Sequence, residues 1–143
     1  MYMDKEQIKN IIPHRDPMLL VDEVIELKDG ESIKTKFYIS PDREIFKGHF
    51  PNAPVFPGIY TVECMAQTAD ILLLSMQRYN NTTPFFIGIN NVRFMSKIEP
   101  DDTIEIHAQL TLDKKEKGIA TCSTEVYNKG DLAASGEVTL AMR

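Results

Sequence analysis

Residues 57–79, which read PGIYTVECMAQTADILLLSMQRY, decide the fold that this sequence predicts. Pro57 suits the first position of a helix, and the pair Asn80-Asn81 suits its end. Between them, apolar residues cover well over half of the circumference of the helix. A helix of that kind is usually buried. We therefore expect one long central helix from about Pro57 to Tyr79.

Segments with the two-residue period of β-strands lie on both sides of this helix. The clearest is residues 103–112, where apolar and polar residues alternate as in a sheet with one dry face. Gly136 is expected at a bulge or at a close approach between strands. A short helix at 4–12, capped by Asp4, is expected before the first strand. Further strands are expected at residues 19–27, 33–39, 85–94, 119–127 and 132–142.

The fold class that follows is α+β, with an antiparallel sheet of about five or six strands packed around one long helix. The chain has 143 residues and neither a linker nor a repeat, so residues 1–143 are expected to form one domain. A net charge of -5 disfavours a nucleic-acid partner. The longest apolar stretch is interrupted by polar residues and does not predict a membrane span. Two cysteines without metal-ligand spacing, and no visible signal peptide, favour a reduced, cytoplasmic protein.

The segment that carries chemistry is GHFPNAPVFPG at residues 48–58. A proline at every third position fixes φ and stiffens this loop, which can then hold His49 against the start of the helix. Glu63, Gln67 and Asp70 share one face of that helix. The alternative is that this face is merely the solvent side of the helix. The narrow polar stripe, and the helix dipole that favours an anion at Glu63, argue for a site.

The other two histidines are interpreted as ordinary polar residues. His14 follows Pro13, and His107 lies on the polar face of a predicted strand. No histidine clusters with cysteine or carboxylate at ligand spacing. We therefore expect neither a metal site nor a cofactor.

The 48–58 motif, followed by Glu63 and Ala66-Gln67, resembles the active-site motif of the FabZ-type 3-hydroxyacyl-[acyl-carrier-protein] dehydratases. The similarity spans nearly the whole chain. It implies a hot-dog fold, in which the sheet wraps around the central helix, and homodimers with composite active sites, often assembled as a hexamer (a trimer of dimers). Flanking segments that also match are IPHR at 12–15, PMLLVD at 17–22, GI at 88–89, VRF at 92–94 and PDD at 100–102.

The resemblance also implies the reaction, which is dehydration of a (3R)-3-hydroxyacyl-[acyl-carrier-protein] to the trans-2-enoyl product in fatty acid biosynthesis. His49 and Glu63, from different subunits, would be the catalytic pair. Gly58 would donate its backbone N–H to the thioester carbonyl, and Gln67 would orient Glu63. A neutral imidazole is available as a base near pH 7, and burial among apolar residues helps a carboxyl to act as an acid. Whether His49 makes both proton transfers stays open.

Four positions depart from the family pattern. Asn52 stands for glycine, Phe56 for methionine, Tyr60 for an aliphatic residue and Asp70 for a small one. Phe56 and Tyr60 are expected to bind the acyl chain. Because both are bulky, they predict a narrowed tunnel that favours short acyl chains.

The acyl carrier protein is an acidic partner, and this chain is itself acidic, so docking needs a local basic patch. Lys47, Arg93 and Lys97 flank the motif loop and the later matching segment, and they are the candidates. The alternative is that each is an ordinary solvated charge.

Several alternatives remain open. A hot-dog acyl thioesterase would share the fold and hydrolyse the thioester, and a non-catalytic acyl-thioester sensor would not need both His49 and Glu63. The same dehydration could also serve a polyketide or specialised-lipid pathway. FabA-type enzymes, which also isomerise the double bond, carry aspartate at the helix position. Glu63 therefore favours the plain dehydratase, while isomerase activity stays open.

Overall fold

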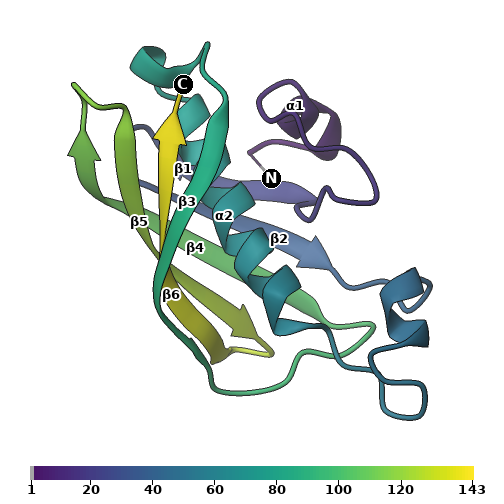
Figure 1. Ribbon diagram of the computed structural model, residues 1–143. Coiled ribbons are helices and arrows are strands. Elements are labelled where there is room, and N and C mark those ends of the chain that lie inside the picture. Colours follow the sequence, from purple (N-terminus) through teal and green to yellow (C-terminus); the bar gives the residue numbers. More distant parts are fainter. Residues whose placement is uncertain (1) are drawn as a thin grey trace.

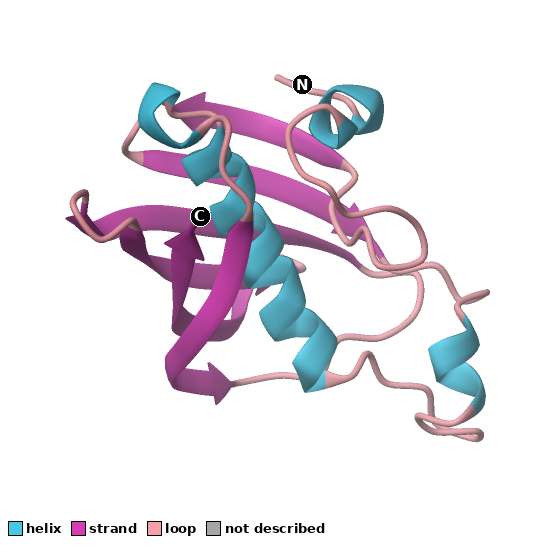
Figure 2. Ribbon diagram, turned by 45° about the horizontal axis from the view of Figure 1, so that its top comes forward, coloured by secondary structure: helices cyan, strands magenta, loops and turns pink. Residues whose placement is uncertain are grey.

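Helix α2, Gly58–Leu74, lies against the inner face of an antiparallel six-stranded sheet that curves around it (Figures 1 and 2). This computed structural model describes residues 2–143. The α+β, hot-dog arrangement expected from the sequence is confirmed. The other elements are α1 Lys5–Lys9, β1 Glu23–Lys28, β2 Ser32–Tyr38, η1 Glu44–Lys47, η2 Gln77–Tyr79, β3 Pro84–Phe94, β4 Thr103–Lys114, β5 Ile119–Asn128 and β6 Asp131–Met142.

The central helix is buried over nearly its whole length, as its apolar circumference predicts. It is shorter than expected at both ends. Pro57 is the residue before the first turn rather than part of it, and the helix ends at Leu74 instead of near Tyr79. Both the N–H and the hydroxyl of Ser75 bond to the carbonyl of Ile71, and Met76 then adopts an extended backbone. The chain continues into the short 3-10 turn η2.

The strands follow the order β1-β2-β4-β5-β6-β3, so β1 and β3 are the two edges of the sheet. The first strand begins at Glu23 rather than at Leu19. The residues before it, Leu19 to Val21, are buried but do not pair with a strand. The N–H of Leu20 instead donates to the side-chain oxygen of Gln67 on α2. This connection ties the N-terminal segment to the central helix.

The N-terminal helix ends earlier than expected. Asp4 caps it as expected, because its side chain accepts from the N–H of Gln7, and the Gln7 side chain accepts from the N–H of Asp4. The helix ends at Lys9 rather than at Ile12, and Ile12 is nevertheless buried. Among residues 2–143, no helix is both long enough and apolar enough to span a bilayer.

Gly136 lies opposite a bulge in β3, as its position in the strand pattern predicts. The β3–β6 register shifts between Asn90 and Arg93. A Cβ on Gly136 would lie only 2.8 Å from Cγ2 of Val92. A bulge bends its strand, and the residue that ends β3, Phe94, lies over the first turn of α2.

Candidate active site

The motif loop fixes one tautomer of His49. Its Nδ1 lies 2.9 Å from the carbonyl oxygen of Val55. A carbonyl oxygen only accepts, so Nδ1 carries the hydrogen, and in the neutral ring Nε2 has the lone pair. The half-buried ring also stacks on Phe50, with 4.2 Å between ring centroids. His49 therefore presents Nε2 as a base.

Backbone hydrogen bonds hold this loop in place. The N–H of Val55 donates to the carbonyl of His49 at 3.0 Å, and the N–H of Phe56 donates to the carbonyl of Ile98 at 2.7 Å. The second bond ties the loop to the segment that follows β3. Small displacements of a catalytic base are costly in rate, and this double attachment limits them.

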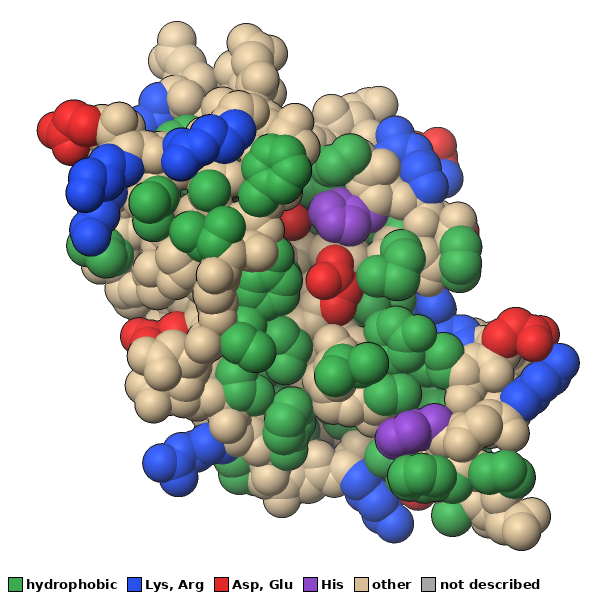
Figure 3. Space-filling view, viewed as in Figure 1, with side chains coloured by type: hydrophobic (Ala, Val, Ile, Leu, Met, Phe, Trp, Pro, Cys, Tyr) green, Lys and Arg blue, Asp and Glu red, His purple; other side chains and the backbone are tan. Residues whose placement is uncertain are grey.

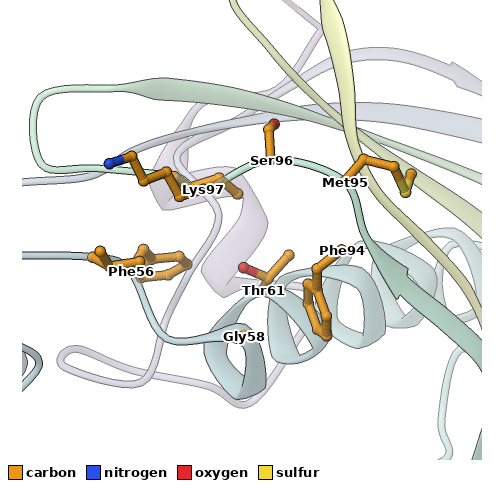
Figure 4. Close-up of a pocket in the computed structure, with 9 residues that line it drawn as sticks. Phe56, Gly58, Thr61, Phe94, Met95, Ser96 and Lys97 are labelled. Atoms are coloured by element: carbon orange, nitrogen blue, oxygen red, sulfur yellow. The ribbon is translucent and has the colours of Figure 1, made fainter.

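Gly58 begins α2 at the wall of a pocket of about 450 Å³ (Figure 4). The structure records no acceptor for the Gly58 N–H within residues 2–143. Free N–H groups at a helix start carry partial positive charge and favour an anion. The ring of Phe94 covers the glycine, and a Cβ there would lie 2.9 Å from its Cζ. The pocket is lined by Val55, Phe56, Gly58, Thr61, Phe94, Met95, Ser96, Lys97 and Ile98.

The side-chain amide of Gln67 holds Glu63 from within the helix. Gln67 is fully buried, and its oxygen accepts from the N–H of Leu20. Its Nε2 donates to the carbonyl of Met18 at 2.7 Å and to Oε2 of Glu63 at 2.8 Å. Because both ends of the amide are engaged, its orientation is fixed and Oε2 of Glu63 must accept. Oε1 of Glu63 is left free of this bond.

His14 belongs to the surroundings of Glu63, a position that the sequence did not predict. Its Nε2 lies 3.6 Å from Oε2 of Glu63 and 3.9 Å from Oδ2 of Asp70. Figure 3 shows a histidine in purple beside an acidic side chain in red, with hydrophobic side chains around them. The Pro13-His14 segment leads directly into Met18 and Leu20, which bind Gln67. The strand pattern of the sequence does not reveal that Met18 and Leu20 are attached to α2.

The polar stripe of α2 is not a solvated face, since Gln67 is 0% and Asp70 only 4% exposed. Burial, and then the nearby Glu63 carboxylate, raise the pKa of Asp70 well above its ordinary value. Burial lowers the pKa of His14, against the opposing attraction of Glu63. Each shift favours the uncharged form of the group concerned.

The predicted acyl-chain residues lie together, and one of them, Phe56, also lines the first pocket. Phe56 is buried and stacks against Tyr60, with ring centroids 5.9 Å apart. Both line a second pocket of about 220 Å³. Its other lining residues are Pro17, Met18, Leu20, Arg43, Glu44 and Ile45.

The basic candidates differ in their surroundings. Lys97 lines the pocket beside Gly58 (Figure 4), and its Nζ lies 3.9 Å from Glu99. Lys47 forms an exposed ion pair with Glu44 at 3.0 Å. Arg93 is exposed on β3. The structure thus brings Lys97 to the site and leaves Lys47 engaged elsewhere.

Within the part of the chain that the structure describes, no hydrogen bond or ion pair joins His49 to Glu63. His49 contacts Val55 and Phe50, whereas Glu63 contacts Gln67 and His14. No group of three or more cysteine, histidine or acidic side chains among residues 2–143 is arranged to hold a metal ion.

Solved structures share this fold at low sequence identity. The dehydratase heterocomplex ApeI:P from Xenorhabdus doucetiae superposes with a TM-score of 0.80 at 17% identity, covering 100% of this chain and 93% of that one. A hypothetical thioesterase protein with coenzyme A from Streptococcus pneumoniae gives a TM-score of 0.66 at 10% identity, with 85% and 84% covered. These likenesses concern the fold.

Sequence comparison is more specific. The family model described as FabA-like domain matches residues 12–137. The 3-hydroxyacyl-[acyl-carrier-protein] dehydratase FabZ of Oenococcus oeni is 37% identical over 99% of this chain and 100% of its own length. That of Oceanobacillus iheyensis is also 37% identical, with 99% of each covered. The chain therefore belongs to the FabZ-type 3-hydroxyacyl-[acyl-carrier-protein] dehydratases, within the FabA-like domain family.

Proposed function

We propose that this chain dehydrates (3R)-3-hydroxyacyl-[acyl-carrier-protein] to the trans-2-enoyl thioester in fatty acid biosynthesis in the cytoplasm. The observation that carries this proposal is the bond from Nδ1 of His49 to the carbonyl of Val55. It leaves a lone pair on Nε2, in a loop that leads to the free N–H of Gly58. A base and an oxyanion donor are the two elements that α-proton removal from a thioester needs.

The residues suit the steps of an elimination. Nε2 of His49 takes the α-proton, and the electron pair moves toward the thioester oxygen, where the Gly58 N–H stabilises the developing charge. The pair then forms the α,β double bond and expels the β-hydroxyl. Glu63 of the partner subunit, as a carboxylic acid, protonates the departing oxygen, which leaves as water.

The edge strand β3 supports a dimer that would bring this pair together. A long apolar edge strand is a ready surface for another strand, and Figure 3 shows hydrophobic side chains gathered on the face that carries β3. We propose that a second copy of the chain covers it, and that three such dimers form a hexamer. The exposed apolar side chains on and just after β3 are Phe85, Phe86, Ile87, Ile89, Phe94 and Met95.

Substrate choice follows from the two pockets. Phe56 and Tyr60 line the second pocket, and we propose that they narrow the path of the acyl chain and so favour short acyl chains. Lys97 at the first pocket is proposed to meet the acidic carrier protein, together with Arg93 and Lys47. Four-carbon substrates should then react faster than sixteen-carbon ones, and equal rates would contradict the narrowed path.

The test follows enoyl-thioester absorbance with 3-hydroxybutyryl thioesters of acyl carrier protein and of coenzyme A. The wild-type protein should form the enoyl product from both substrates, and faster from the carrier-protein thioester. His49→Ala and Glu63→Gln should each lose about 10²–10⁴-fold in kcat. The matched control is His107→Gln, because His107 pairs with Glu105 on the sheet at 2.6 Å and should leave the rate unchanged. Release of free thiol without enoyl product would instead indicate a thioesterase.

A further inference from the structure

Three polar side chains surround Glu63 within its own subunit. Gln67 and Asp70 come from the same helix, and His14 comes from the segment before β1. We call Glu63, Gln67, His14 and Asp70 the Glu63 cluster. Its geometry is complete in one chain, so it does not depend on how the subunits assemble.

The fixed amide of Gln67 makes Oε2 of Glu63 an acceptor that faces His14. Since Gln67 Nε2 donates to Oε2 of Glu63, that oxygen is an acceptor. Nε2 of His14 faces the same oxygen at 3.6 Å, longer than a hydrogen bond, and the two atoms attract when Nε2 carries a hydrogen. The same nitrogen also faces Oδ2 of Asp70 at 3.9 Å. Two carboxyl groups thus lie next to one imidazole nitrogen.

Two buried atoms of the cluster have no hydrogen-bond partner, Nδ1 of His14 and Oδ1 of Asp70. Unpartnered buried polar atoms are rare because they cost stability, so each calls for an explanation. A hydrogen on Nε2 leaves only a lone pair on Nδ1. A neutral Asp70 leaves no charge on Oδ1, which lowers the cost of burying that atom without a partner.

We propose that His14 is a positioning residue for Glu63 in the dehydration proposed above, and that Asp70 controls how far the His14 N–H engages Glu63. With Asp70 neutral, Oε2 of Glu63 receives donors from Gln67 and His14, and Oε1 is aimed at the reacting hydroxyl. With Asp70 ionised, its full charge draws the N–H of His14 away from Glu63. Glu63 then keeps one donor and loses its fixed orientation.

The other titratable groups around the Glu63 cluster cannot take the role proposed for Asp70. Cys122 on β5 faces Asp70, and burial raises the pKa of its thiol to about 12, so it stays neutral. Arg15 faces His14 and disfavours a charged imidazole. The guanidinium of Arg15 is itself bound to the carbonyls of Lys9, Ile12 and His14.

The first experiment separates positioning from a structural role. His14→Leu removes the donor, whereas His14→Gln keeps an amide donor of comparable reach. His14→Leu should lower kcat about tenfold to hundredfold, with KM nearly unchanged, and His14→Gln should recover most of the loss. His107→Leu is the matched control and should behave as wild type, while thermal unfolding and size-exclusion chromatography establish that each variant is folded and assembled.

The second experiment measures the pH dependence of kcat. Wild type should lose activity on the alkaline side as Asp70 ionises, and Asp70→Asn, which cannot ionise, should remain active to higher pH. His14→Leu should lack this alkaline limb as well. An unchanged limb in Asp70→Asn, or equal kcat losses in His14→Leu and His14→Gln, would overturn the proposal. Wild type without dehydratase activity would instead refute the proposed function, while an active wild type that tolerates His14→Leu would refute only the role of His14.

Discussion

At the scale of single residues, Asp70 makes the stability of the protein depend on pH. Its carboxyl is buried and its pKa is raised well above the ordinary value, by burial first and by Glu63 second. Below the pKa of the unfolded chain, about 3.9, both states hold the proton. Above it, only the folded state does, so the free energy of unfolding falls with rising pH until the folded pKa is passed.

Asp70→Asn should remove this dependence because the amide has the shape of the carboxyl and no charge. The gain in the free energy of unfolding should be small near pH 4 and should grow by about 1.4 kcal/mol per pH unit while Asp70 stays protonated in the folded state. Urea denaturation between pH 4 and 8 measures it. The exposed Asp42→Asn is the control, with no growing gain. A gain of equal size at every pH would show that burial of the charge is not its source.

Gly58 offers a test of the pocket at the same scale. A methyl group there would meet the ring of Phe94 at 2.9 Å, beside the N–H proposed to face the thioester oxygen. Gly58→Ala should therefore lower kcat/KM at least tenfold, about the effect of a displaced oxyanion donor. Gly48→Ala, with nothing within 4 Å of its added Cβ, is the matched control in the same steady-state assay. Equal activity of the two variants would remove Gly58 from the oxyanion site.

At the scale of elements, the bulge between β3 and β6 positions the segment that covers Gly58. A Cβ on Gly136 would lie 2.8 Å from Cγ2 and 3.2 Å from Cα of Val92, and the second contact is with backbone. Gly136→Ala should therefore destabilise the protein by about 1–3 kcal/mol. The double variant with Val92→Ala should recover part of that loss, because it removes the side-chain contact only. The midpoints of urea unfolding measure both effects. If Gly136→Ala left the stability unchanged, β3 and β6 would be able to move apart at this point without cost.

The elements that could be predicted are those whose pattern is local. The alternation at 103–112 and the apolar circumference of α2 each indicate burial along one segment. The structure contains both the strand and the buried helix. The segment Leu19–Val21 could not be placed in this way, because it is held by the side chain of Gln67 rather than by a strand. The proximity of His14 to Glu63 was missed for the same reason. Its contact with Glu63 joins residues far apart in sequence, and no local period reports it.

At the scale of the whole molecule, the apolar edge strand should control assembly. Ile89 on β3 is 56% exposed, although burial of such side chains is favourable. Ile89→Lys places a charge on this edge, and it should weaken the dimer by at least about tenfold. Sedimentation velocity across a range of concentrations measures this, with activity falling as dimers dissociate. Leu112→Lys, at a site of similar exposure (47%) on β4, is the control. Equal dimer strength in both variants would place the interface elsewhere.

The composite site predicts that two inactive variants restore each other. In a mixed dimer of His49→Ala and Glu63→Gln chains, one site receives His49 from the second chain and Glu63 from the first, so it is intact. The other site carries both substitutions. Random pairing makes half of the dimers mixed, each with one intact site, so coexpressed chains should reach about a quarter of wild-type activity. Separate tags on the two chains allow the mixed dimers to be purified, and these should approach half. If His49 and Glu63 instead acted within one subunit, every site in the mixture would lack one of them, and the mixed dimers would be as inactive as their parents.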